Sequence, residues 1–243
     1  MEKTDWFTAS VHDIDFLTFV QQGVDNKGLK PFIAPSSKVV CVGRNYVEHA
    51  KELNNPVPKS PILFIKPNSA LVKIDQTILI PTHSECHHEL EIAILIGKKI
   101  SHIKPDDARH AIAGIGLALD LTLREVQGNL KKSGHPWEIA KAFDGACPVT
   151  AFIPYSSEWA LDNITFSMKK NNSVVQQGNS RQMIFDIENL VSRISNHFTL
   201  LPGDIVLTGT PAGVSALDKG DELELYLEEK LLASCVVKSE HHN

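Results

Sequence analysis

The sequence predicts an α+β fold built on a rolled, mixed β-sheet with a few flanking helices. Short β-branched runs bounded by Gly, Pro, Asn or Ser recur along the chain, as in "KVVCVG", "PILFIKP", "QTILIP" and "GIGLALDLT". The expected strands outnumber the helices and do not alternate with them regularly, which argues against a doubly wound parallel sheet. Neither "GRNY" nor "TGTPAG" has the glycine spacing of a nucleotide-binding loop.

The length and composition fit one globular domain. The chain has 243 residues, of which 42% are hydrophobic and 22% are charged, as is typical of a soluble protein. The strand pattern begins near residue 37, so we expect a single domain over residues 37–243. Residues 1–36 are punctuated by Gly and Pro and form a lead-in whose structure the sequence does not predict.

The charge and the cysteines exclude several kinds of partner. A net charge of −5 without a basic stripe argues against binding of nucleic acid. No apolar run approaches the ~20 residues that cross a membrane, and "MEKTDWFTAS" lacks the pattern of a targeting segment. The four cysteines form no C-x-x-C pair and suit a reducing compartment as free, buried thiols. We therefore expect a cytoplasmic or mitochondrial-matrix type of protein that acts on a small molecule.

Helices and a hairpin are expected at defined places among the strands. The first helix, "YVEHAKEL", follows the first strand, and the second, "KPDDARHAI", opens with Pro105. A third should begin at Thr122, where Thr122 and Glu125 can form a capping box. A hairpin with "NN" at its turn precedes the fourth helix, "DIENLVSRISNHF". The strands "DIVLTG", "DELELYLE" and "LLASCVVK" then close the chain.

One expected strand carries two glutamates. In "ELEIAILI", residues 89–96, alternation places Glu89 and Glu91 on one face and the leucine and isoleucines at even-numbered positions on the other. Two carboxylates about 6–7 Å apart on a strand repel each other, and burying them unpaired is unfavourable. Solvent, basic side chains or a metal ion could supply the compensating charge.

A third carboxylate ends another strand pattern. In "GIGLALDLT", Asp120 shares a face with Gly114, Gly116 and Ala118. If this strand lies beside the one with the glutamates, three carboxylates converge where small residues leave room for a ligand. Such an all-oxygen site suits Mg²⁺, with Mn²⁺ or Ca²⁺ as alternatives. The other interpretation is a solvent-facing edge, with Asp120 merely ending a strand.

Six segments of the chain resemble the fumarylacetoacetate hydrolase superfamily, in particular its acylpyruvate hydrolase and oxaloacetate decarboxylase branch. They are "CVGRNYVEHAKEL", "PILFIKP", "HHELEIAILIGK", "LALDLTLREVQ", "GHPWEIAKAFDGACPV" and "PGDIVLTGTPAGV". The resemblance implies a rolled mixed-sheet fold, a homodimer, and Mg²⁺ or Mn²⁺ held by Glu89, Glu91 and Asp120. The substrate is then a small 2-oxo acid that chelates the ion through its carboxylate and 2-oxo oxygens.

His49 and Glu52 are the expected catalytic dyad. They are three residues apart on an expected helix, so they share a face and the carboxylate can orient the imidazole. By themselves they fit an exposed i,i+3 ion pair better, and the flanking "GRNY" match reverses that preference. In the resembling family this His–Glu pair activates the water that cleaves an acylpyruvate.

The resemblance also implies substrate contacts. Family positions matching Arg124, Gln127 and Lys141 line the substrate pocket, where a lysine stabilises negative charge or transfers a proton. From spacing alone, Arg124 and Gln127 could be a solvated helix face. Thr210 lies in a glycine-containing turn whose hydroxyl and N–H groups could bind the substrate carboxylate.

Four further features are expected around this site. Arg44 and Lys66 come just after strands and should neutralise the acidic centre and bind substrate. His87 shares strand parity with the two glutamates, so it either supports the metal ligands or is a core histidine. The segment "LNNPVPKSP", residues 53–61, is either a hinge or lid, or a rigid surface loop.

The function that the sequence favours is a Mg²⁺-dependent hydrolase that cleaves the C–C bond of acylpyruvates and also decarboxylates oxaloacetate. The metal would stabilise the carbanion left when that bond breaks. One alternative is an isomerase or tautomerase of 2-hydroxy-2,4-diene dioates or of oxaloacetate, which needs no hydrolytic water. Another is a non-catalytic metal- or ligand-binding protein, and the His49–Glu52 pair counts against it because binding alone needs no base.

Overall fold

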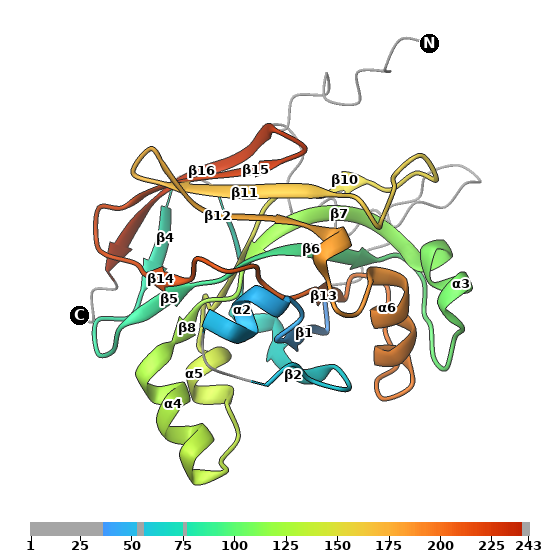
Figure 1. Cartoon of the computed structure of the whole chain (residues 1–243), viewed down its shortest axis with the longest axis horizontal. Coiled ribbons are helices and arrows are strands. Elements are labelled where there is room, and N and C mark those ends of the chain that lie inside the picture. Colours follow the sequence, from blue (N-terminus) through green and yellow to red (C-terminus); the bar gives the residue numbers. More distant parts are fainter. Residues whose placement is uncertain (1–35, 53–55, 75–76, 240–243) are drawn as a thin grey trace.

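Three β-sheets with helices at their margins form the framework of the protein (Figure 1). The computed structural model describes residues 36–52, 56–74 and 77–239. The strands are β1 (Lys38–Gly43), β2 (Ile62–Pro67), β3 (Leu71–Lys73), β4 (Thr77–Ile80), β5 (Cys86–His88), β6 (Leu90–Ile96), β7 (Ile112–Leu119), β8 (Thr122–Leu123), β9 (Cys147–Val149), β10 (Ile153–Pro154), β11 (Thr165–Lys170), β12 (Ser173–Asn179), β13 (Ile205–Leu207), β14 (Ser215–Ala216), β15 (Glu222–Leu227) and β16 (Lys230–Ser239). The helices are α2 (Val47–Glu52), α3 (Pro105–Ala108), α4 (Arg124–Ser133), α5 (Glu138–Lys141) and α6 (Ile187–Ser195), with the 3₁₀ turns η1 (Asn68–Ala70), η2 (Arg109–Ala111) and η3 (Ser180–Gln182).

The two larger sheets are mixed, as the sequence predicted, and the small third sheet is antiparallel. The largest has the order β2-β1-β13-β6-β7-β9-β3, with β10 added to β7, and it contains both parallel and antiparallel pairs. A five-stranded sheet, β12-β11-β15-β16-β4, lies across β6 and β7 in Figure 1. A small third sheet has the order β14-β5-β8. The expectation of an α+β fold with a rolled mixed sheet is confirmed.

The faces predicted from alternation are the faces that the structure buries. On one face of β6 and β7 and the residues that follow β7, eight side chains lie in the main hydrophobic core: Leu90, Ile92, Ile94, Ile96, Ile115, Leu117, Leu119 and Leu121. Each fully buried leucine or isoleucine contributes about 1.5–3 kcal/mol relative to an exposed one. The opposite face packs into a second cluster that contains Ala93 and Ala118. Both faces of these strands are therefore covered, which isolates Glu91 from bulk water.

The expected helices are present, but one of them begins later than predicted. α6 starts after Asp186, whose side chain accepts a hydrogen bond of 2.8 Å from the backbone of Asn189. α4 begins at Arg124 and not at Thr122, and it has no side-chain cap. Thr122 instead pairs with His87 in the small sheet, and its hydroxyl donates to the carbonyl of Asp120. The predicted capping box is wrong because strand pairing takes the residue that would have formed it.

The structure also bears on the predicted hairpin turn and on the predicted state of the cysteines. Asn171 and Asn172 have positive φ angles of 52° and 65° and form the predicted hairpin turn between β11 and β12. All four cysteines are buried and none forms a disulfide, as predicted. Residues 1–35 of the lead-in and residues 53–55 of the proline-containing segment lie outside the described residues.

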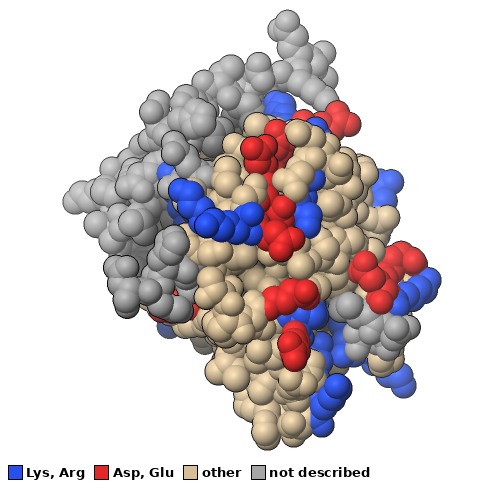
Figure 2. Space-filling view, turned by 90° about the vertical axis from the view of Figure 1, so that its left-hand side faces the viewer, with Lys and Arg blue, Asp and Glu red and all other residues tan. Residues whose placement is uncertain are grey.

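The surface carries charges of both signs. Figure 2 shows acidic side chains next to basic ones on the face that it presents. Among the helices in the described part of the chain, none is both long and apolar enough to cross a membrane.

Candidate active site

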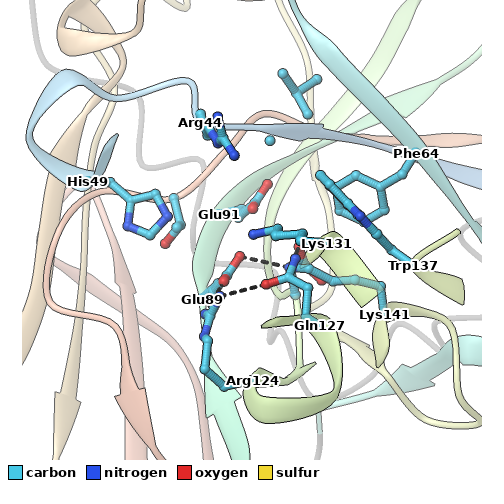
Figure 3. Close-up of a pocket in the computed structure, with 14 residues that line it drawn as sticks. Arg44, His49, Phe64, Glu89, Glu91, Arg124, Gln127, Lys131, Trp137 and Lys141 are labelled. Carbon is cyan, nitrogen blue, oxygen red and sulfur yellow. Dashed lines mark hydrogen bonds and ion pairs between the residues drawn. The ribbon is translucent and has the colours of Figure 1, made fainter. Parts of the chain in front are cut away.

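A pocket lies where β1, β2, β6 and α4 approach one another (Figure 3). It collects nine of the residues that the sequence singled out: Arg44, His49, Glu89, Glu91, Asp120, Arg124, Gln127, Lys141 and Thr210. Its remaining lining comes from Val42, Gly43, Phe64, Lys131 and Trp137. Residues from distant parts of the sequence therefore meet in one polar cavity with aromatic walls.

The three acidic side chains converge as expected. Glu91 is opposite Ala118 in the β6–β7 register, and the backbone N–H of Asp120 donates to the carbonyl of Glu89 over 2.8 Å. One carboxylate oxygen from each of Glu89, Glu91 and Asp120 lies within 4.8 Å of the other two. The space beside Gly116 was expected to admit a ligand, but Thr150, Ala151 and Phe152 fill it, since a Cβ there would lie 3.0–3.1 Å from their atoms.

Two of the three carboxylates already have cationic partners. Lys141 Nζ lies 2.9 Å from Glu89 Oε2 and 2.6 Å from Asp120 Oδ2, and Arg124 Nη2 contacts Glu89 Oε1. Burial alone would raise the pKa of Glu89, but the positive charges of Lys141 and Arg124 hold it well below its ordinary value. Burial would lower the pKa of Lys141, but Asp120 and Glu89 outweigh it and raise that pKa. The ammonium of Lys141 is therefore charged.

Glu91 lacks such a partner. Among the described residues, the backbone N–H of Gly209, 2.6 Å from Oε2, is its hydrogen-bond donor, and no cationic side chain forms an ion pair with it. Burial, reinforced by the charges of Asp120 and Glu89, raises the pKa of Glu91 well above its ordinary value. Among the described residues, the Glu91 carboxylate therefore lacks a cation that would compensate its negative charge.

The donor set fits a hard divalent cation. All three candidate ligands are carboxylates: Glu89 and Glu91 come from the start of β6, Asp120 follows the end of β7, and Glu91 has no cationic partner among the described residues. Mg²⁺ and Mn²⁺ prefer such oxygen ligands. Glu89, Glu91 and Asp120 are therefore the residues that would hold the ion.

Lys66 lies behind this centre and does not line the pocket. Its side chain is fully buried, and Nζ is 2.8 Å from Asp120 Oδ1. It also donates to the backbone carbonyls of Leu121 and Ala146, at 3.3 and 3.0 Å, and to that of Lys141. It neutralises the acidic centre as expected. Its position, however, does not match the substrate contact that the sequence analysis assigned to it, because strand β2 directs it into the interior.

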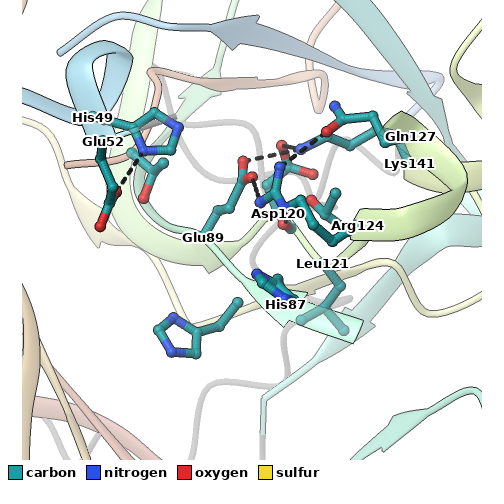
Figure 4. A network of polar contacts seen from close by, with 12 residues as sticks. His49, Glu52, His87, Glu89, Asp120, Leu121, Arg124, Gln127 and Lys141 are labelled. Carbon is teal, nitrogen blue, oxygen red and sulfur yellow. Dashed lines mark hydrogen bonds and ion pairs between the residues drawn. The ribbon is translucent and has the colours of Figure 1, made fainter. Parts of the chain in front are cut away.

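The His49–Glu52 pair lies at the end of α2 (Figure 4). Both carboxylate oxygens of Glu52 are hydrogen-bonded. His49 is buried, and its Nδ1 lies 3.2 Å from Glu52 Oε2. Glu52 Oε1 also accepts the backbone N–H of Gly213 over 3.0 Å. Because a carboxylate accepts, Nδ1 carries the hydrogen in the neutral ring, and Nε2 keeps the lone pair of a base.

The backbone of the turn around Thr210 donates hydrogen bonds to two of the protein's own carboxylates. Gly209 donates its backbone N–H to Glu91, and Gly213 donates to Glu52. Their φ angles of 97° and 100°, and the closeness of Asn45 and of Val175 to any added Cβ, require glycine at both positions. These two N–H groups are therefore already engaged, and binding of a substrate carboxylate by this turn stays a prediction. The hydroxyl of Thr210 does line the pocket.

Gln176 and His88 form a buried support that the sequence analysis missed. Gln176 Nε2 donates to Thr210 Oγ1 over 2.8 Å, while Oε1 accepts from the backbone of Leu90 and from His88 Nδ1, both at 2.9 Å. An amide oxygen only accepts, so His88 Nδ1 carries the hydrogen and Nε2 accepts from the Ser215 hydroxyl. Burial lowers the pKa of His88 to about 4 and keeps it neutral.

His87 has a different environment from either expected role. Its Nε2 lies 2.6 Å from Glu85 Oε1, and it does not line the pocket. Its side chain is 17% exposed. It is therefore a partly exposed residue next to the buried His88, which takes the core position.

Lys131 and Trp137 were also missed as pocket residues. Lys131 Nζ lies 5.1 Å from the centre of the Trp137 ring, and Lys141 Nζ lies 5.2 Å from that of Phe64. Arg124, Gln127 and Lys131 follow one another at intervals of three and four residues on α4. The helical spacing was therefore a usable signal for Lys131.

Comparisons with known proteins agree with this site and fold. The family model described as fumarylacetoacetate (FAA) hydrolase C-terminal matches residues 38–237. The oxaloacetate tautomerase YcgM of Escherichia coli (strain K12) is 48% identical over 206 residues, covering 84% of this chain and 94% of that protein. The mitochondrial oxaloacetate tautomerase of Caenorhabditis elegans is 43% identical over 197 residues, with 81% and 92% covered. The chain thus belongs to the fumarylacetoacetate hydrolase family.

A solved structure adds information about a related site. Fumarylpyruvate hydrolase from Pseudomonas aeruginosa, in complex with Mn²⁺ and pyruvate, has a TM-score of 0.80 and 32% sequence identity. The alignment covers 88% of this chain and 94% of that one. The superfamily resemblance and the fold that it implied are therefore confirmed.

Proposed function

We propose that this protein is a divalent-metal-dependent enzyme that interconverts the enol and keto forms of oxaloacetate. The relatives from Escherichia coli and Caenorhabditis elegans carry the name oxaloacetate tautomerase, and each is matched over more than nine-tenths of its length. The isomerase alternative of the sequence analysis is thus better supported than hydrolysis of acylpyruvates, which that analysis placed first.

The pocket provides a binding site for the carboxylate and 2-oxo group of a 2-oxo acid. Mg²⁺ or Mn²⁺ held by Glu89, Glu91 and Asp120 would supply a Lewis acid for the carboxylate and 2-oxo oxygens of the substrate. The Mn²⁺ and pyruvate in the Pseudomonas aeruginosa relative support this choice of ion and substrate head. Thr210 and Gln127 line the pocket and provide hydrogen-bonding groups for that head.

The opposed placement of His49 and Lys141 is the observation that carries the proposal. In Figure 3 they lie on opposite sides of the two glutamates. Ketonisation removes one proton from the enol oxygen and adds one to C3, so it needs a base and an acid with no net change in protons. The free Nε2 of His49 can accept a proton, and the charged ammonium of Lys141 can donate one. Solvent exchange then restores both groups.

Hydrolysis of a 2,4-dioxo acid is the second candidate. The His49–Glu52 pair favours it, because a hydrolytic water needs an oriented base. The fumarylpyruvate hydrolase from Pseudomonas aeruginosa also supports it, at lower sequence identity than the tautomerases.

The test is a comparison of three reactions on one preparation. Purified protein with Mg²⁺ would be mixed with the enol form of oxaloacetate, and loss of the enol absorbance would be followed against a control with chelator. Pyruvate release from acetylpyruvate and from fumarylpyruvate would be measured in parallel. Faster ketonisation with little pyruvate release is the expected result. Pyruvate release without faster ketonisation would assign the hydrolase, and neither activity would reject both reactions.

A further inference from the structure

The pocket contains two cations that are not committed to the acidic centre. Arg124 and Lys141 are paired with Glu89, and Lys141 is also paired with Asp120. Within the described residues, Lys131 and Arg44 line the same pocket and form no ion pair with a carboxylate. Positive charge is therefore available on a part of the pocket wall that the metal ligands do not use.

Lys131 is held in an unfavourable place for a lysine. Its ammonium lies against the Trp137 ring, and its side chain is half-buried. Burial, together with the positive charges of Arg124, Lys141 and Arg44, lowers the pKa of Lys131 to about 8. An anion bound between these cations would remove both the repulsion and part of the desolvation penalty. Cations that lie in one pocket and repel one another favour the binding of an anion there.

Arg44 approaches the same space from another element. It follows β1 directly, in a left-handed conformation with φ of 59°. In Figure 3 Arg44 and His49 lie on one side of the pocket, Phe64 and Trp137 on the other, and Lys131 between them. A ligand bound at the carboxylate triad therefore has a cation within the same pocket for a second negative group.

We propose that Lys131, assisted by Arg44, binds the distal carboxylate of a 2-oxo dicarboxylic acid and makes the pocket select dicarboxylates over their uncharged analogues. The proposal rests on the proposed function in one respect, that the 2-oxo acid head binds at the triad. A four-carbon diacid is short, so its second carboxylate stays inside the pocket when the head is at the metal ligands. The partly buried Phe64 and Trp137 rings line this part of the pocket, and a charge–charge contact is stronger beside such apolar groups than in bulk water.

The experiment compares a ligand that has a distal negative charge with its methyl ester, which lacks that charge. Mg²⁺-saturated protein would be titrated calorimetrically with oxaloacetate and with its 4-methyl ester. A hydrogen bond to a charged group corresponds to roughly a 10- to 100-fold change in affinity. Lys131→Met should weaken oxaloacetate binding by about that factor and leave ester binding within about twofold. Lys131→Arg should restore most of the affinity for oxaloacetate.

Controls separate this role from a structural one. Lys132→Met changes the exposed neighbour on α4 and should alter neither ligand. The Mg²⁺ affinity of Lys131→Met should match the wild type, which shows that the triad is intact. Equal weakening of both ligands in Lys131→Met, or equal affinities in the wild type, would overturn the inference. Failure of both ligands to bind the wild type would overturn the proposed function and this inference with it.

Discussion

Lys66 Nζ lies 2.8 Å from Asp120 Oδ1, and both side chains are almost completely buried. The same ammonium donates to three backbone carbonyls, of which one directly precedes β8, one ends α5 and one directly precedes β9. One buried lysine thus connects an edge strand to the segment that carries a proposed metal ligand. The positive charge that compensates the acidic centre therefore comes from two places: Lys66 in the interior, and Lys141 and Arg124 in the pocket lining.

Replacing Lys66 by Met should destabilise the protein strongly. The change leaves Asp120 without a buried counter-ion and leaves carbonyls without a donor, and breaking a buried pair typically costs about 3–5 kcal/mol. The free energy of unfolding would be measured by urea denaturation of metal-free protein. Lys73→Met, at an exposed position on β3, is the control and should change stability by less than about 0.5 kcal/mol. Unchanged stability together with a raised KM would instead support the substrate contact assigned from the sequence.

Replacing Glu91 by Gln should change how stability depends on pH. The raised pKa of Glu91 means that the folded, metal-free protein holds this proton more tightly than the unfolded chain does. Its contribution to stability is therefore fully present below the ordinary pKa of 4.5 and is lost as the pH rises through the folded-state pKa. Metal-free wild type should lose stability relative to Glu91→Gln as the pH rises above 4.5.

The pH range above 4.5 separates the contribution of Glu91 to stability from that of Glu89. Glu89, with its lowered pKa, adds stability above its ordinary value of 4.5 and loses it only below that value. His88 is unchanged in both proteins, so its effect cancels in the difference. Thermal unfolding at a series of pH values, with and without Mg²⁺, measures the effect. A constant difference across this range in metal-free protein would contradict the assignment of a high pKa to Glu91.

Gln176 should position Thr210 and so affect substrate binding without touching the substrate. Gln176→Met removes the donor to the Thr210 hydroxyl and leaves His88 Nδ1 and the Leu90 N–H without their acceptor. Each orphaned buried donor costs about 1–3 kcal/mol, so stability should fall and KM for oxaloacetate should rise. Gln177→Met, at the exposed neighbour on β12, is the matched control. An unaltered KM in Gln176→Met would limit Gln176 to a structural role.

The strands and the acidic triad could be predicted because their signals are local. Alternation in "ELEIAILI" and "GIGLALDLT" fixed which side chains share a face, and those faces are buried as expected. That the two strands are neighbours, which brings Asp120 to the glutamates, came from the family resemblance. Periodicity within one strand says nothing about which other strand will pair with it.

The contacts that were missed depend on pairing between distant segments. Lys66 donates to carbonyls 55 to 80 residues away, and Gln176 lies 88 residues from His88. No pattern within β2 or β12 indicates those partners. The capping box at Thr122 failed for the same reason, since pairing of β8 with β5 overrode a favourable local signal. Lys131 is different, because its spacing from Gln127 on α4 was visible in the sequence.

His49 should separate the reactions that this pocket could catalyse. Ketonisation and hydrolysis both need a base, and loss of a general base typically lowers the rate by roughly 10²- to 10⁴-fold. Decarboxylation of oxaloacetate needs no proton acceptor at the bond-breaking step, because CO₂ departs and only the remaining negative charge has to be stabilised. His49→Ala should therefore lose ketonisation and hydrolysis by about that factor, while decarboxylation falls much less or rises. His49 is not a candidate metal ligand, so Mg²⁺ affinity should be retained.

All three rates would be measured on one metal-saturated preparation, so that a folding or metal defect would appear in each of them. His83→Ala, at an exposed histidine, is the control for the loss of an imidazole elsewhere. Glu52 orients His49 through Nδ1 and is itself held by Gly213, so Glu52→Gln should reproduce the pattern with a smaller loss. If His49→Ala lowers all three rates equally, His49 organises the whole site, and the role of proton acceptor proposed for its Nε2 would be wrong.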